Sequence, residues 1–215
     1  MGLVLLVFNW IIISRLGVPG VAAFTIINHT FWFGLMIAYG ISESMLPVIS
    51  TNLGARLPDR IKYFLILANS SAVGVGIVLF IFFTAFPEKL IGFFLKSNEF
   101  ETIQIALSFT DIIKWAFFFS GINIILSAYF TAMHRPMESV VVALSRSLVL
   151  PVLALTILPL IYGNEGLYIA IPFAEAVTFF LALFLFLRNR PVKLVNLLGH
   201  ISFKKNANIS SAQKQ

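Results

Sequence analysis

Three charged side chains, Glu43, Arg146 and Glu175, stand within otherwise apolar stretches of the sequence. A charge inside a membrane is costly, so each of them marks a hypothesis about function if these stretches cross a bilayer. Glu43 lies in the later part of a long apolar segment, where a carboxylate can exchange a proton. Two structural alternatives stay open for Glu43: it holds the kink at Pro47, or it pairs with Arg146.

Arg146 keeps its positive charge under almost all conditions, which makes it a poor proton carrier and a good partner for a carboxylate. Glu43 and Glu175 are its two possible partners within the apolar stretches. Glu175 follows Pro172 by three residues, where backbone groups freed by the proline need other partners. We therefore expect a structural or gating ion pair at Arg146, and we take Glu43, Arg146 and Glu175 as the candidates for ion coupling or gating.

Three uncharged polar side chains, Asn28, His29 and Asn123, also interrupt apolar stretches. Such residues join membrane helices by hydrogen bonds more often than they bind ligands. Both interpretations stay open, and we take these three as the candidates for polar residues in a cavity.

Sequence patterns typical of enzymes are missing. The histidines His29, His134 and His200 lack the spacing of metal ligands. The sequence has neither a glycine-rich phosphate loop nor a Ser-His-Asp arrangement. We expect no enzymatic activity, no metal site and no cofactor, with Na⁺ or H⁺ serving only as a coupling ion.

Composition identifies the class of protein that must position these residues. The 215 residues are 59% hydrophobic and only 11% charged, whereas soluble domains contain about 25% charged residues. A soluble fold could not cover so much apolar surface. The absence of cysteine excludes disulfides and thiol chemistry. The sequence therefore predicts an all-α integral membrane protein.

The length allows about six spans, because each span needs about 20 residues. The first is short, since only the 14 residues from Met1 to Ser14 are uncharged. A signal peptide is the competing interpretation there, but no basic residues precede the apolar stretch. We expect residues 1–187 to form one transmembrane bundle and 188–215 a basic, polar cytoplasmic tail; the expected helices cover about 1–15, 20–52, 62–86, 102–133, 137–161 and 166–187.

The distribution of basic residues predicts the orientation in the membrane. Ten lysines and arginines lie in the tail and in the loops after the second and fourth spans, against three on the other side. Basic loops remain in the cytoplasm, so we expect a multi-pass protein of the cytoplasmic (inner) membrane with both termini inside. The orientation in the membrane explains the net charge of +6. We therefore expect membrane lipid as a partner and no nucleic acid.

Three blocks of sequence carry a resemblance to a known family. Residues 40–55 read GISESMLPVISTNLGA, which resembles the Gly…Glu…Pro…Asn-x-Gly-Ala signature of the multidrug and toxic compound extrusion (MATE) family. Residues 129–136 and 145–175 resemble the loop and the last two helices of the same transporters. The blocks follow the family's order across residues 15–188, and they match its C-terminal six-helix half better than its N-terminal half.

The resemblance implies a twelve-helix transporter made of two six-helix halves, of which this chain would form one. Members of the family rock the halves to exchange organic cations for Na⁺ or H⁺ by alternating access. Two positions depart from the pattern, because Leu46 precedes the signature proline where many relatives have glutamine, and the middle of the fourth helix holds Asn123 where some branches carry an acid. The second departure weakens the case for ion coupling through that helix.

Two functional hypotheses follow. The first is secondary active multidrug efflux of small organic compounds, cationic and aromatic, in exchange for Na⁺ or H⁺. The alternative is a truncated half without independent transport, which either needs a second half or is non-functional; the short first helix, which looks clipped at Met1, favours it. A homodimer of two halves is a third possibility, and it would place two copies of Glu43 about one two-fold axis.

Overall fold

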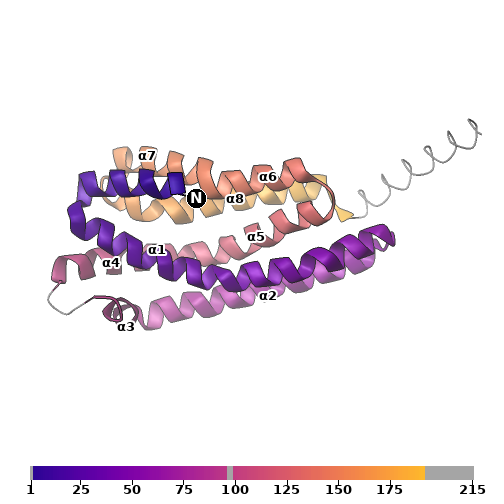
Figure 1. Cartoon of the computed structure of the whole chain (residues 1–215), viewed down its shortest axis with the longest axis horizontal. Helices are drawn as coiled ribbons and strands as arrows, with labels where there is room; N and C mark the ends of the chain where they lie inside the picture. The colour runs from indigo at the N-terminus through magenta and orange to yellow at the C-terminus, as the bar shows by residue number, and fades with distance from the viewer. Residues whose placement is uncertain (1, 96–98, 192–215) are drawn as a thin grey trace, which may run out of the picture.

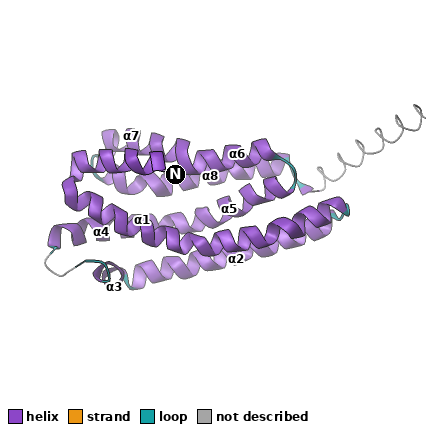
Figure 2. Ribbon diagram, viewed as in Figure 1, coloured by secondary structure: helices purple, strands orange, loops and turns teal. Residues whose placement is uncertain are grey.

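The computed structural model describes residues 2–95 and 99–191. Figure 1 shows an elongated bundle whose helices run roughly along its long axis. Within the described residues every regular element is a helix, and short loops connect them (Figure 2). Residues 192–215, which include most of the expected tail, lie outside the described part.

The first helix, α1 (Gly2–Gly54), is broken near its start. Gly17 has φ 65° and ψ −163°, which is not helical, and glycine adopts positive φ without the strain of a Cβ. The chain reverses there, so residues 2–16 form an N-terminal arm that lies beside α7 and α8 (Figure 1). Two of the expected helices are therefore parts of one element, divided at Gly17.

The next two helices each begin at a proline. Helix α2 (Pro58–Ala85) and the short α3 (Pro87–Gly92) each begin with proline at the first turn, followed by an acidic residue. Backbone N–H groups in the first turn of a helix have no partner within the helix, so proline loses nothing by lacking one. An acidic side chain there interacts favourably with the positive end of the helix dipole. Residues 87–92 are thus helical, where the sequence suggested a loop.

One long span is built from three successive elements. These are α4 (Phe100–Ile113), the 3₁₀ turn η1 (Lys114–Ala116) and α5 (Phe117–Ala132). The span is the most buried of those in the described residues, and it packs against α1, α2 and α8. It therefore forms the centre of the bundle.

The remaining described helices form an antiparallel pair. The first member consists of α6 (Pro136–Leu144), the π-helical turn η2 (Ser145–Val149) and α7 (Leu150–Tyr162), and the second is α8 (Glu165–Arg188). Pro151 explains the π turn, because its ring cannot accommodate the carbonyl four residues earlier and it has no N–H to donate. The backbone N–H of Leu150 donates instead to the carbonyl of Ser145.

Small residues let α2 and α5 approach closely. A Cβ added at Gly76 would lie 2.7 Å from the backbone oxygen of Phe117, and one at Gly121 would lie 3.2 Å from the Cβ of Ala72. Close backbone approach at small residues is a common way for membrane helices to pack. This contact fixes α2 against the central span.

Five helical spans among the described residues are long and apolar enough to cross a membrane. They cover residues 5–54, 58–85, 100–132, 136–162 and 165–188. The N-terminal arm adds a sixth, shorter helix to the bundle, as Figure 1 shows. The α1–α2 turn, the α5–α6 turn and the end of α8 meet at one end of the bundle (Figure 1). That end carries most of the described basic residues: Arg56, Arg60, Lys62, Arg135, Arg188 and Arg190.

Candidate functional site

A buried ion pair joins Arg146 in η2 to Glu175 in α8. The Nε of Arg146 donates to the Oε1 of Glu175 at 2.8 Å. The two side chains are only 10% and 6% exposed. Of the two acids that the sequence left open as partners, the structure pairs Arg146 with Glu175. The π turn matters here, because it sets the direction in which the Arg146 side chain leaves its helix.

Two more side chains complete a buried polar cluster, which we define as Tyr39, Asn123, Arg146 and Glu175. The Nδ2 of Asn123 donates to the backbone oxygen of Glu175 at 2.9 Å and to its Oε2 at 2.8 Å. The Nη1 of Arg146 donates to the hydroxyl of Tyr39 at 2.9 Å. The buried polar cluster therefore links α1, η2, α5 and α8.

The electrostatics of the cluster favour a fixed ion pair. Both carboxylate oxygens of Glu175 already accept a hydrogen bond, one of them from a permanent cation. The opposite charges cancel, and breaking such a buried pair is costly because it leaves one charge uncompensated. The arrangement can act as a lock between helices, which is the structural or gating role expected for Arg146.

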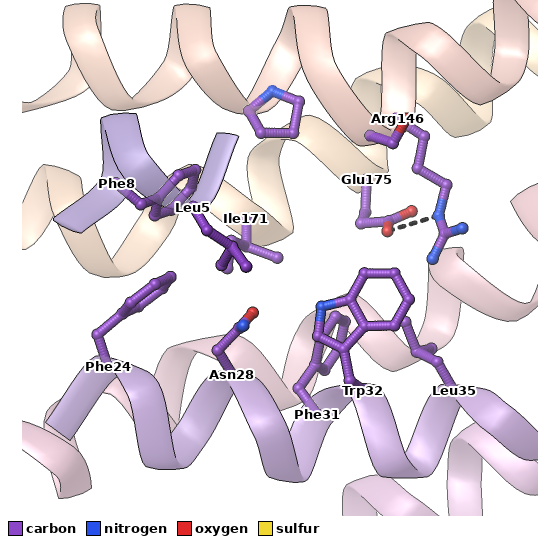
Figure 3. Close-up of a pocket in the computed structure, with 12 residues that line it drawn as sticks. Leu5, Phe8, Phe24, Asn28, Phe31, Trp32, Leu35, Arg146, Ile171 and Glu175 are labelled. Atoms are coloured by element: carbon purple, nitrogen blue, oxygen red, sulfur yellow. Dashed lines mark hydrogen bonds and ion pairs between the residues drawn. The ribbon is translucent and has the colours of Figure 1, made fainter. Parts of the chain in front are cut away.

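A cavity of about 90 Å³ lies next to the buried polar cluster. Figure 3 shows it between α1 and the helices that carry Arg146 and Glu175. Its walls are mainly aromatic and aliphatic, and Asn28 points into it from α1. Asn28 and the ion pair thus face one small chamber inside the bundle. The side chains that line it and are labelled in Figure 3 are Leu5, Phe8, Phe24, Asn28, Phe31, Trp32, Leu35, Arg146, Ile171 and Glu175.

The other two candidate residues lie elsewhere. Glu43 and His29 are exposed on α1, and neither lines this cavity. They are 14 residues apart, which is close to four helical turns, so they share one face at a distance of about 21 Å along the axis. That face carries Thr25, His29, Phe33, Met36, Gly40, Glu43, Pro47 and Thr51, all exposed, and we call it the exposed α1 face.

Two aromatic residues of the site were not among the candidates from the sequence. The rings of Trp32 and Tyr39 stack at 6.2 Å with an angle of 5° between their planes, and Tyr39 also lies 5.7 Å from the Arg146 guanidinium. Their spacing of seven residues places them on one side of α1. A tyrosine in an apolar span, whose hydroxyl needs a partner, was the signal that could have found the site.

Comparison with known proteins identifies the family. The family model described as MatE matches residues 3–156, which is well over half of the sequence. The chain belongs to the MatE family. A MATE chain with this apolar composition and these helices is a membrane protein, and the likeness that the three sequence blocks carry is confirmed.

Solved MATE structures share the fold. The chain matches a MATE in complex with MaL6 with a TM-score of 0.83 and 19% identity, over 90% of this chain and 44% of the other. It matches a MOP superfamily transporter from Pyrococcus furiosus with a TM-score of 0.82 and 20% identity, over 90% of this chain and 43% of the other. The six-helix bundle is therefore the fold of one part of such transporters.

A curated relative is similar in sequence. A FAD transporter from Shewanella oneidensis is 32% identical over 140 residues, which cover 64% of this chain and 30% of that protein. The present chain thus spans less than half of the length of each of these relatives.

Proposed function

We propose that this chain forms one half of a secondary active transporter, which moves a small organic compound across the cytoplasmic membrane by alternating access. Na⁺ or H⁺ is the coupling ion. The proposal rests on the MATE fold together with a polar, exposed helix face in the middle of an apolar chain. The basic end of the bundle faces the cytoplasm, in line with the charge distribution.

The observation that carries the proposal is the position of Glu43 on the exposed α1 face. Glu43 lies about 16 Å from the end of α1 at Gly54, so it falls within the depth of a membrane. No described residue forms an ion pair with it. A carboxylate is too costly to face lipid. The exposed α1 face therefore borders water or a second polypeptide.

A second six-helix bundle is the partner that fits this face. Glycine, threonine and proline beside Glu43 leave room for a close or water-filled contact, and two facing bundles create the cavity that alternating access needs. Glu43 would release its ion as substrate binds, while the Arg146–Glu175 pair keeps its own bundle rigid. The partner is either a separate half or a second copy of this chain.

Two sources bear on the class of substrate. The resemblance favours cationic, aromatic compounds, whereas the relative from Shewanella oneidensis is a FAD transporter. Both alternatives share a planar aromatic group, which suits aromatic walls. We therefore propose planar aromatic organic compounds as the substrate class.

Transport assays test the proposal directly. The chain is expressed alone in cells that lack their own dye efflux, and the export of a cationic dye and of a flavin is measured under an imposed Na⁺ or proton gradient. We expect gradient-dependent export, and loss of most of its ion dependence in Glu43→Gln. Ser44→Ala, the neighbouring exposed position, serves as the matched control and is expected to export normally.

Other outcomes decide against the proposal or between its forms. Equal export by the unmodified chain and Glu43→Gln would show that Glu43 is not the coupling acid. If the inserted chain exports nothing by itself, independent transport is excluded, and the alternative of a half that needs a partner is favoured. Because the sequence has no cysteine, disulfide crosslinking of Thr51→Cys in the membrane then shows whether two copies pair along this face.

A further inference from the structure

The cavity beside the buried polar cluster contains an amide without a partner. Asn28 is 7% exposed, and its side chain points into the cavity in Figure 3. Its amide can donate two hydrogen bonds and accept two, yet it forms none with any residue that the structure describes. Because its side chain faces the cavity, the Asn28 amide is available to a molecule that enters there.

Arg146 supplies further unused donors at the same cavity. Its guanidinium has five N–H groups, of which one on Nε and one on Nη1 reach Glu175 and Tyr39. The other three have no acceptor among the described residues. Glu175 offers fewer free sites, because its carboxylate can accept about four hydrogen bonds and two of these are already formed.

This balance determines the charge of a suitable ligand. The free capacity consists of the Asn28 amide, which can donate or accept, and of three guanidinium N–H groups of Arg146, which can only donate, so donors predominate. A cation would meet the free N–H groups of Arg146, and the Glu175 carboxylate beside them is already neutralised by that guanidinium. The ligand must therefore present hydrogen-bond acceptors, such as carbonyl or anionic oxygens.

The walls determine its shape. Aromatic side chains from the N-terminal arm and α1 surround the polar groups, with Phe8 and Phe24 stacked at 5.0 Å on one side and Phe31 and Trp32 on the other (Figure 3). Aromatic walls favour flat rings. About 90 Å³ is enough for the edge of a ring system, whereas an engineered cavity of about 150 Å³ holds a whole benzene.

We propose that this cavity binds the acceptor-bearing edge of a planar heteroaromatic compound, uncharged or anionic at that edge, with Asn28 and Arg146 as the hydrogen-bond donors. The site lies inside one bundle and is separate from the exposed α1 face with Glu43. It deepens the proposed function by naming the chemistry of one end of the substrate. Binding does not depend on transport, so a chain that fails to export can still be tested.

Equilibrium binding of lumichrome, an uncharged planar ring system with a carbonyl edge, tests the proposal on the purified full chain in nanodiscs. We expect saturable binding that is at least tenfold weaker in Asn28→Leu, because the apolar side chain cannot donate to the carbonyl edge. His29→Gln is the matched control, since its neighbouring side chain lies on the exposed α1 face, and its affinity is expected to stay unchanged.

A planar cation, proflavine, provides the second arm. We expect it to bind at least tenfold more weakly than lumichrome to the unmodified chain, and Asn28→Asp to shift the preference toward proflavine. The thermal unfolding of each variant is measured in parallel, and Asn28→Asp keeps the test informative if Asn28→Leu does not fold. Unsaturable lumichrome binding, an unchanged affinity in folded Asn28→Leu, or equal binding of proflavine would overturn the proposal.

Discussion

A single amide nitrogen, Nδ2 of Asn123, holds both the backbone oxygen and the side-chain Oε2 of Glu175, at 2.9 and 2.8 Å. The two residues are 52 positions apart and lie on α5 and α8. Asn123 is fully buried, so its bonds have no competition from water. The central span therefore fixes the acid that in turn fixes Arg146.

Replacing Asn123 by leucine should destabilise the bundle. Asn123→Leu leaves the Oε2 of Glu175 unpaired in a buried site, which costs about 1–3 kcal/mol. Thermal unfolding in detergent measures the loss as a lower Tm. Asn69→Leu is the control, because the Nδ2 of Asn69 donates only to the carbonyl of Leu65 one turn earlier. Equal melting of the two variants would show that the interhelical bonds contribute little.

Neutralising Glu175 should have a larger effect. Glu175→Gln leaves the buried Arg146 charge without its counter-ion, at a cost of about 3 kcal/mol. The pair of Asp111 and Lys114, joined at 2.9 Å with Asp111 72% and Lys114 13% exposed, offers a control within the same chain, because the acid that is replaced is open to solvent. Asp111→Asn should cost less than about 1 kcal/mol. Unfolding in denaturant or by heat compares the two.

The double variant Arg146→Met with Glu175→Leu separates charge from packing. Removing both charges relieves the uncompensated cation, so part of the stability lost in Glu175→Gln should return. If the double variant is less stable than Glu175→Gln, the two side chains stabilise the bundle by more than the mutual neutralisation of their charges.

Two glycines on α2 should respond in opposite ways to the same substitution. At Gly76 an added Cβ would lie 2.7 Å from the carbonyl oxygen of Phe117, whereas at Gly74 nothing lies within 4 Å. Gly76→Ala should therefore lower the Tm by forcing α2 away from α5. Gly74→Ala should leave it unchanged or raise it, because alanine favours the helix by about 1 kcal/mol. A higher Tm in both would contradict the close α2–α5 contact.

Thiol labelling distinguishes water from lipid at the exposed α1 face. The chain has no cysteine, so a single introduced thiol gives a clean signal. A charged, membrane-impermeant maleimide should react with Glu43→Cys much faster than with Phe180→Cys, because the thiolate needs water. Phe180 is 65% exposed on an apolar face of α8. Equal, slow reaction at both positions would place Glu43 against lipid.

Apolar composition and helix-breaking residues were enough to predict most of the architecture. Pro136 begins a helix close to the expected start at 137, whereas the helices that begin at Pro58 and Pro87 start earlier than expected or were not expected at all. The π turn at η2 was not predicted, because Pro151 is compatible with a kink, a bulge or a first helical turn. Only the packing of the α6–α7 segment against α8 decides among them.

The charged and amide side chains of the site were predictable, whereas its aromatic members and its connections were not. The free-energy cost of a charged side chain in the membrane identified Glu43, Arg146 and Glu175 as candidates, but it did not indicate which acid pairs with Arg146. That choice depends on how each helix is rotated about its axis, and the apolar residues on all sides of these spans carry little information about rotation. For the same reason Asn28 and His29, adjacent in sequence, were treated alike, although one enters the cavity and the other faces outward.

The order of synthesis gives the Arg146–Glu175 pair a further consequence. The two residues are 29 positions apart, and Glu175 lies on α8, the last helix of the described bundle. Because a chain emerges from the ribosome starting at its N-terminus, Arg146 reaches the membrane ahead of the helix that carries its acid. Its cost there, about 2.5–3.5 kcal/mol on insertion scales, is relieved only when α8 arrives. A chain that ends before Glu175 therefore carries an uncompensated positive charge inside its bundle.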